Sequence, residues 1–333
     1  MLVFFLVISS LCNAGKSHGG VIKTVIILYM FSTVLAAVIA VFASMAFPVK
    51  MTLANAATDT SAPQGIVEVL NNLLLNVVAN PVSSLVNANY VGILMWAVLL
   101  GLAFRAADKM TKKVLADVAD GISMVVTWII NLAPFGIFGL VFNTVSTNGL
   151  DIFTTYGKLL LLLVGCMLFI YFVTNPLLVY WCIRQNPYPL IFHCLKRSAL
   201  TAFFTRSSAA NIPVNMKVCE EMGLDRDTYS VTIPLGATIN MDGAAITITV
   251  MTMATAFTLG IHVDIPTAII LSLLAALSAC GASGVAGGSL LLIPMACSLF
   301  GISDDISMQV VAVGFIILSL IHISEPTRLG MIS

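Results

Sequence analysis

Two polar segments interrupt the apolar second half of the chain, and they hold residue types that bind small polar ligands and cations. The first, residues 203–213, reads FFTRSSAANIP, and the second, residues 240–243, reads NMDG. Hydroxyls, amides and a carboxylate are tolerated at membrane depth only where protein or a water-lined cavity satisfies them. The two segments are therefore candidate binding sites, and they favour a carrier over a membrane anchor.

A third segment offers backbone chemistry. Residues 278–289 read SACGASGVAGGS, and glycine lets the main chain approach a ligand closely and adopt conformations closed to other residues. The alternative is that these small residues only let membrane helices pack closely. More small residues gather here than such a packing face requires, which favours a binding tip.

The composition places these segments inside a membrane protein. Hydrophobic residues make up 59% of the 333-residue chain and charged residues 9%, against about 25% charged in soluble domains. The formal net charge is zero and there is no long basic tract, so nucleic-acid binding is excluded. The seven cysteines and four histidines show no ligand spacing. We therefore expect neither a transition-metal site nor a nucleophile–base pair, and no enzyme.

Apolar runs of about twenty residues predict an all-α polytopic membrane protein. Residues 20–48 and 159–183 are expected to cross as single helices, and residues 64–145 to hold further spans. Residues 1–15 read as the end of a membrane helix. A signal peptide is disfavoured there because no basic residue precedes the apolar run.

Loop charge gives the orientation and singles out two unusual segments. Lysines and arginines gather in alternate loops, which the positive-inside rule places in the cytoplasm, while the loops near 54–64 and 145–151 have none. Residues 184–217 then enter from the cytoplasm and return to it as a re-entrant hairpin. Residues 265–300 form the mirror hairpin from outside, and residues 228–259 form a span broken at NMDG. Opposed hairpins facing a broken helix are the inverted-repeat geometry of secondary transporters.

Three stretches resemble the dicarboxylate/amino-acid:cation symporters, the family of the glutamate transporters, and within it the bacterial sodium/serine–threonine symporters. They are RSSAANIPV at 206–214, PLGATINMDG at 234–243 and GASGVAGG at 281–288. The likeness runs from about residue 2 to about residue 318. It implies a glutamate-transporter-like fold and a homotrimer. Scaffold helices would come from residues 1–15 and 64–145, and a mobile transport domain from residues 20–48 and 153–318, with its last helix starting at 308–318.

The resemblance also implies a site, residue by residue. The substrate would bind at the two hairpin tips and the second half of the broken helix, through Arg206, Ser207, Ser208, Ala209, Ala244, Val285, Ala286, Gly287 and Ser289. Sodium, the coupling ion, would be held at the helix break, the first full span and the second hairpin, by Gly236, Thr238, Asn240, Met241, Asp242, Tyr29, Ser32, Thr33, Ala279, Cys280 and Ala282. Na⁺ takes oxygen ligands, so the Met241 sulfur would be an unusual one. No organic cofactor is expected.

Each group has a structural alternative. Ser207 and Ser208 would also serve as helix caps, and Asp242 as the buried ion-pair partner of Arg206. Tyr29, Ser32 and Thr33 form one polar helical face, in which Ser and Thr are exchanged relative to the family. The alternative for this face is that it only forms hydrogen bonds between helices.

Departures from the family pattern narrow the prediction. Ala244 stands where glutamate and aspartate carriers have a threonine that helps hold the acidic side chain, which favours a small neutral amino acid over a dicarboxylate. Ala286 replaces the proline of the second tip, and we expect it to alter gating more than selectivity. Residues 319–333 lack the carboxylates and asparagine of the family's last helix and read like translated adapter sequence. We expect this tail to be non-native and the chain to be a fragment truncated at both ends.

The predicted function is sodium-coupled uptake of serine or threonine across the bacterial inner (plasma) membrane by alternating access. Dicarboxylate symport is the alternative within the carrier class. A channel would need a continuous polar path, whereas the polar residues here converge on one mid-membrane locus. A non-transporting membrane scaffold would need neither Asp242 nor twin hairpin tips. The expected partners are the amino acid, Na⁺, the lipid bilayer and two further copies of the chain.

Overall fold

The computed structural model describes residues 2–13, 20–51, 74–75, 78–86, 89–131, 151–199, 202, 208, 211–280 and 289–314. Every regular element within these ranges is a helix. Three of the described helices are long and apolar enough to cross a membrane, namely Lys23–Ala46, Tyr156–Ile183 and Thr232–Thr258. Met95–Ala106 and Ile265–Ala279 are shorter apolar helices. The prediction of an all-α polytopic membrane protein is confirmed.

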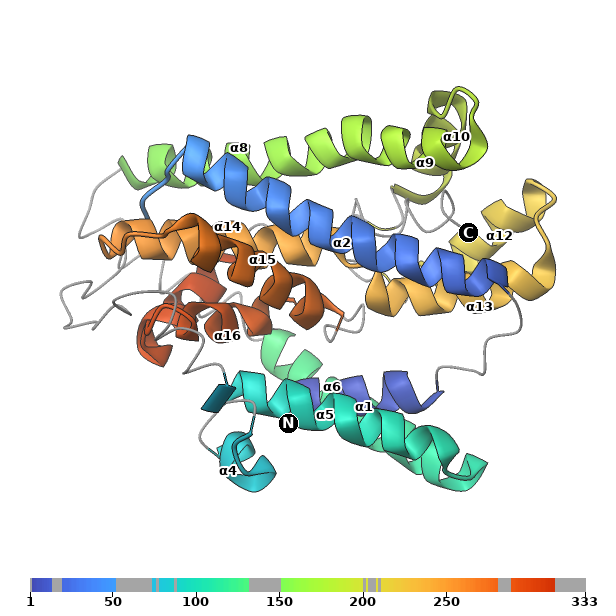
Figure 1. Ribbon diagram of the computed structural model, residues 1–333, viewed down its shortest axis with the longest axis horizontal. Coiled ribbons are helices and arrows are strands. Elements are labelled where there is room, and N and C mark those ends of the chain that lie inside the picture. Colours follow the sequence, from blue (N-terminus) through green and yellow to red (C-terminus); the bar gives the residue numbers. More distant parts are fainter. Residues whose placement is uncertain are drawn as a thin grey trace.

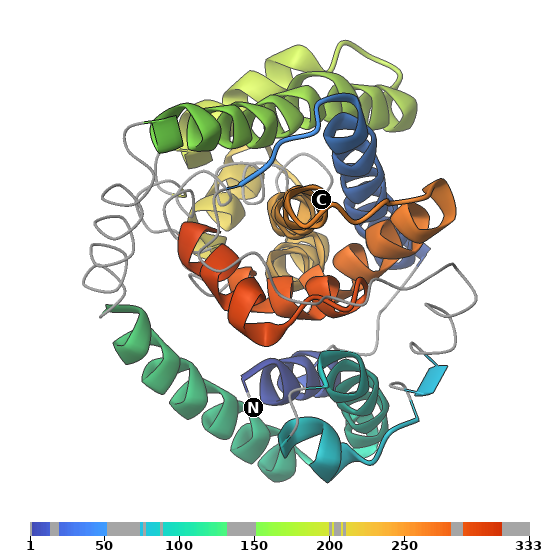
Figure 2. The same ribbon diagram turned by 90° about the vertical axis from the view of Figure 1, so that its left-hand side faces the viewer.

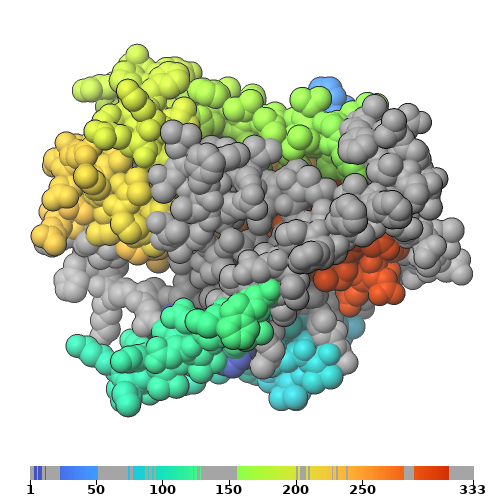
Figure 3. Space-filling view, turned by 180° about the vertical axis from the view of Figure 1, so that it is seen from behind, coloured from blue at the N-terminus to red at the C-terminus, as the bar shows by residue number. Residues whose placement is uncertain are grey.

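One layer of helices lies at the bottom of Figure 1. It consists of α1 (Leu2–Asn13), α5 (Tyr90–Ala103) and α6 (Lys109–Asn131), with the short α4 (Pro81–Val86) and η1 (Phe104–Ala106) beside them. Val7 and Ile8 of α1 pack against Ala97 of α5. Seen from behind in Figure 3, α6 forms part of the lower surface. The assignment of this layer to a scaffold, and of the chain to scaffold and transport domains, stays a prediction.

A second layer is built around α14 (Asp242–Thr258), which is buried along almost its whole length. It is surrounded by α2 (Gly20–Ala46), α8 (Asp151–Phe169), α15 (Ile265–Ala279) and α16 (Ile293–Ser298), as Figures 1 and 2 show. Ala36, Ala37 and Ala40 of α2 are fully buried in this core. In a membrane the hydrophobic effect does not drive helices together, and small side chains instead let the helix axes approach closely and pack. The close packing makes α14 the axis of this layer.

The span predicted over residues 228–259 consists of two helices. Between α13 (Arg226–Ile239) and α14, Asn240 (φ −100°, ψ 74°) and Met241 (φ −113°, ψ 57°) leave the helical region. The Asn240 N–H still donates to the Gly236 carbonyl and the Ala245 N–H to the Met241 carbonyl, both over 2.9 Å. The break therefore lies at the position that the sequence predicted, and as at any helix end it leaves carbonyls at the end of α13 and N–H groups at the start of α14 without partners inside their helices.

The two predicted hairpins are described in part. Residues 184–217 contain α10 (Tyr188–Cys194), the π-helical turn η3 (Leu195–Ala199) and most of α12 (Ile212–Glu221), which extends beyond the expected bound. Arg197 and Glu221 form an exposed ion pair of 3.1 Å between these arms. The second segment contains α15, η4 (Leu290–Leu292) and α16, and its tip at 281–288 lies outside the described residues. The helix expected to start at 308 already begins at 304. Re-entry of the hairpins into the membrane stays a prediction.

The long helix along the top of Figure 1 contains a wide turn. α8 continues through the π-helical turn η2 (Ile170–Thr174) into α9 (Asn175–Ile183). Leu163, before the turn, belongs to the core around α14. Tyr171 and Val179 instead pack against Ile191 of α10, and the Tyr171 hydroxyl donates to the Ile191 carbonyl over 3.1 Å. The one helix therefore contacts two different parts of the fold.

Asp225 caps α13 at its first turn. Its carboxylate accepts hydrogen bonds from the Thr228 N–H over 2.9 Å and from the Thr228 hydroxyl over 2.7 Å. Asp225→Ala removes this acceptor, so we expect the free energy of unfolding to fall by about 1 kcal/mol. Asp225→Asn is the matched control because asparagine caps equally well. Thermal unfolding in detergent checks the prediction, and equal midpoints for all three proteins would contradict it.

Candidate binding site at the helix break

The helix break lies against the polar face of α2. Tyr29, Ser32 and Thr33 are fully buried there. The Tyr29 hydroxyl donates to the Thr232 carbonyl of α13 over 3.4 Å, and Ser32 Oγ lies 3.0 Å from Asn240 Oδ1. Thr33 donates within its own helix, to the Tyr29 carbonyl over 3.0 Å. The structure thus brings the first full span and the broken helix together through Tyr29 and Ser32.

Hydrogen-bond counting favours one orientation of the Asn240 amide. Ser32 Oγ lies within bonding distance of two acceptors as drawn, Asn240 Oδ1 and the Tyr29 carbonyl at 2.9 Å, yet a serine has one proton to donate. Asn240 Nδ2 meanwhile has no partner within the described part of the chain. Turning the amide over lets Nδ2 donate to Ser32 while Ser32 donates to Tyr29. Asn240 Oδ1 is then a buried acceptor that is open to a ligand.

Asp242 is the first residue of α14 and is only 1% exposed. The positive end of the helix dipole favours a negative charge at this position. An ionised carboxylate in an apolar interior is stable where a cation or strong donors share its site. Asn240 belongs to the two-residue break, and Asp242 directly follows it. The arrangement suits a hard monovalent cation, which prefers oxygen ligands.

The start of the second hairpin reaches the same break. Cys280 follows the last residue of α15, and its Sγ lies 3.3 Å from the Ile239 carbonyl and 3.6 Å from Met30 Sδ of α2. Ala279 is fully buried beside it. Sulfur is a soft ligand with little affinity for sodium. The Cys280 and Met30 sulfur atoms therefore pack against the break, and the role of Cys280 in sodium binding stays a prediction.

The remaining predicted residues are placed unevenly. Ser208, Gly236, Ala244 and Ser289 are buried, and the Ser208 carbonyl accepts from the Asn211 N–H over 3.2 Å, in the turn that leads into α12. The hypothesis of an ion pair between Arg206 and Asp242 lies outside the described residues. The side chain of Thr238 also lies outside the described residues. So do the other predicted tip residues, which are Ser207, Ala209, Ala282, Val285, Ala286 and Gly287.

A buried polar cluster next to Ser208 was missed by the sequence reasoning. Asn211 Nδ2 donates to Ser198 Oγ over 2.5 Å, and Ser198 Oγ donates to Asn215 Oδ1 over 2.7 Å. All three are at most 1% exposed. The spacing of the two asparagines, one helical turn apart, was the signal in the sequence. The cluster joins the two arms of segment 184–217 beside the predicted substrate serines.

Comparison with known proteins decides the family. A family model described as the sodium:dicarboxylate symporter family matches residues 1–320. The chain belongs to this family. It is also 60% identical over 318 residues to the "Serine/threonine transporter SstT" of Bifidobacterium adolescentis. The aligned region covers 95% of this chain and 74% of that protein. The resemblance seen in the sequence is confirmed, and the chain is a multi-pass membrane transport protein and not an enzyme.

In this sodium:dicarboxylate symporter family member, Ser32 is expected to hold Asn240 in place. Ser32→Ala removes a hydrogen bond of about 1 kcal/mol, so we expect the apparent sodium affinity to fall roughly fivefold. Sodium titration of transport, or of thermal stability, measures this. Ser272→Ala is a matched control, because Ser272 is buried and its hydroxyl, among the described residues, donates to the Ala268 carbonyl of its own helix. Identical sodium titrations for both variants would exclude the role of Ser32.

Proposed function

We propose that this symporter takes up serine and threonine by sodium-coupled alternating access across the bacterial plasma membrane. The observation that carries the proposal is the buried pair of Asp242 and Asn240 at the helix break, held against the hydroxyl face of α2. The family is named for sodium symport. The relative from Bifidobacterium adolescentis is named a serine/threonine transporter.

Sodium would bind where oxygen atoms converge on the break. The Asp242 carboxylate supplies the charge and Asn240 Oδ1 a neutral oxygen, both in a dry environment where their attraction for a cation is strong. The proposed sodium positions also include backbone and side-chain atoms around them. These belong to Gly236, Thr238, Met241, Tyr29, Ser32, Thr33, Ala279, Cys280 and Ala282.

The amino acid would bind beside the sodium positions. Ser207 and Ser208 precede α12, where hydroxyl and backbone donors favour a carboxylate. Ala244 is 1% exposed near the start of α14 and offers a methyl group in place of a hydroxyl. A small neutral side chain fits such a wall better than a second carboxylate, which would be left without a donor.

The proposed cycle joins these parts. Sodium organises the break, the substrate docks on Ser207 and Ser208, and the tip at 281–288 closes over both. The layer around α14 then moves relative to the layer of α1, α5 and α6, which we propose holds three copies of the chain together. Because the substrate binds well only when sodium has organised the break, the movement of the substrate is coupled to that of the ion.

Reconstitution into proteoliposomes tests the function. With an inward sodium gradient we expect saturable uptake of labelled serine that is inhibited by threonine and not by aspartate, and a potassium gradient should give none. Uptake that persists without sodium would refute the coupling. Aspartate uptake in place of serine would favour the dicarboxylate alternative, and flux without saturation would favour a channel.

A further inference from the structure

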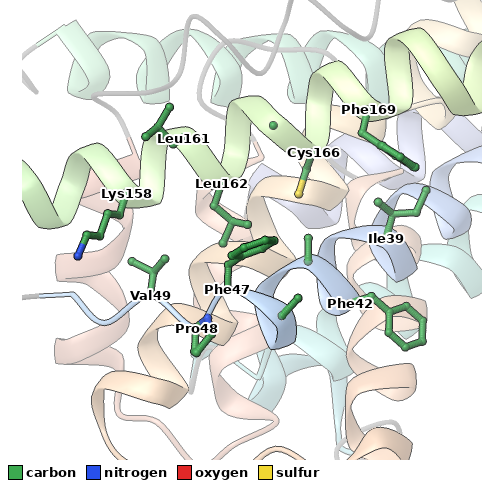
Figure 4. Close-up of a pocket in the computed structure, with 13 residues that line it drawn as sticks. Ile39, Phe42, Phe47, Pro48, Val49, Lys158, Leu161, Leu162, Cys166 and Phe169 are labelled. Atoms are coloured by element: carbon green, nitrogen blue, oxygen red, sulfur yellow. The ribbon is translucent and has the colours of Figure 1, made fainter.

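An apolar groove lies between the end of α2 and the stretch of α8 from Lys158 to Phe169 (Figure 4). Its volume is about 930 Å³, within the range of ligand pockets. Phe42 and Phe47 line it from the α2 side, and Leu161 and Phe169 from α8. Among the described lining residues, Lys158 is the charged one. The groove is thus lined by apolar side chains, with one lysine in its described wall.

The groove lies on an exposed face of the layer around α14, since Phe42, Phe47 and Leu161 of its lining are exposed. Figures 1 and 2 place α8 on the far side of the bundle from α1, α5 and α6. Phe47 is 68% exposed and Leu161 73% exposed, and both belong to, or directly follow, helices that are long enough to span a membrane. Exposed apolar side chains at this depth contact lipid hydrocarbon. An acyl chain is therefore the occupant that matches the walls.

The charge at one end of the groove specifies the headgroup. The Lys158 ammonium lies toward Val49 and away from Phe169 (Figure 4), and Lys50, which is exposed, directly follows Val49. Neither lysine forms an ion pair with a carboxylate in the described part of the chain. Loop charge places this end on the external side, where lysine is disfavoured in general. Two lysines with no ion-pair partner among the described residues, at the rim of an apolar groove, complement a phosphodiester.

We propose that this groove binds one anionic phospholipid of the outer leaflet, with an acyl chain between α2 and α8 and its phosphate at Lys158 and Lys50. Gly165 of α8 lines the groove, and a Cβ added there would meet no atom within 4 Å, so a larger side chain at this position would extend into open space. The lipid would join the end of α2, the helix that carries Tyr29 and Ser32, to α8. Its presence is therefore expected to stabilise the layer around α14.

Native mass spectrometry of the purified protein tests the proposal. The protein is incubated with phosphatidylglycerol or phosphatidylcholine of identical acyl chains, and retained lipid is counted. We expect one phosphatidylglycerol retained in preference to phosphatidylcholine. Lys158→Gln should lower phosphatidylglycerol retention roughly fivefold, whereas Lys158→Arg should keep it. Lys109→Gln, at an exposed lysine of α6, is the matched control and should change nothing.

A second variant tests the groove itself. Gly165→Phe fills the open space and should remove both lipids, and Gly165→Ala, which adds one methyl group, should not. If Gly165→Phe lowers the thermal unfolding midpoint, its lipid retention is set aside and the Lys158 variants alone test the proposal. Equal retention of both lipids by the unmodified chain, or unchanged retention in Lys158→Gln, would overturn the proposal. Lipid counting needs neither sodium nor substrate, so this result is separate from that of the proposed function.

Discussion

Asp242→Asn is expected to abolish sodium-driven serine uptake while the protein stays folded. The carboxylate is only 1% exposed at the start of α14, and asparagine keeps its size while removing its charge. Removing one partner from a buried charge pair costs about 3–5 kcal/mol, or roughly 10²- to 4×10³-fold in ion affinity. Initial uptake rates measured against sodium concentration give the result.

The control for this variant must remove a carboxylate without touching the break. Asp305→Asn does so, since Asp305 is exposed at the start of the helix at 304–314, and it should leave sodium dependence unchanged. A sodium-induced rise in the unfolding midpoint provides a reading that needs no transport, because a ligand that binds the folded state stabilises it. If Asp242→Asn keeps that rise, the cation is held elsewhere.

Ser208→Ala is expected to raise the KM for serine about 10- to 100-fold with little change in sodium affinity. Ser208 is fully buried in the turn before α12. A hydrogen bond from its hydroxyl to a substrate carboxylate is of the charge-assisted kind, which contributes about 1.5–3 kcal/mol. Serine uptake over a range of substrate concentrations, at saturating sodium, separates KM from the maximal rate.

Ser298→Ala is the matched control for Ser208, because Ser298 is an exposed serine at the end of α16 whose hydroxyl donates to the Met295 carbonyl. It should leave KM and the maximal rate unchanged. A Ser208→Ala protein with normal KM but a lowered unfolding midpoint would show that the serine is only a helix cap. That result would favour the structural alternative for this segment.

The sequence was sufficient to find the helix break. Asn240 and Asp242 stand out because an apolar helix has no use for an amide and a carboxylate in its middle, and the structure breaks the helix between them. The polar face of α2 was equally visible, since Tyr29 and Ser32 sit in an apolar span. The family resemblance grouped this face with Asp242 as sodium ligands, but the contact of Ser32 with Asn240 was not predicted, because nothing local links two residues so far apart along the chain.

Other features left little readable signal. The π-helical turn at Leu195–Ala199 lies in a segment that reads as ordinary helix. The turn at Ile170–Thr174 is followed by Pro176, whose missing N–H disfavours a continuous α-helix there. Ser198 could not be linked to Asn211 and Asn215 without knowing how the arms of the hairpin face each other. The groove beside Lys158 likewise depends on where α8 lies relative to α2.

The wide turn in the α8–α9 helix has a consequence for motion. Relative to a continuous α-helix, one extra residue turns all later side chains by about 100°. The first half of the helix accordingly faces α14, and the second half faces α10 and α12. A tilt of α14 that carries α8 with it must also displace the arms beside Ser208. The ion-binding and substrate-binding halves of the proposed site would then change position in one concerted step, unless the helix straightens at residues 170–174.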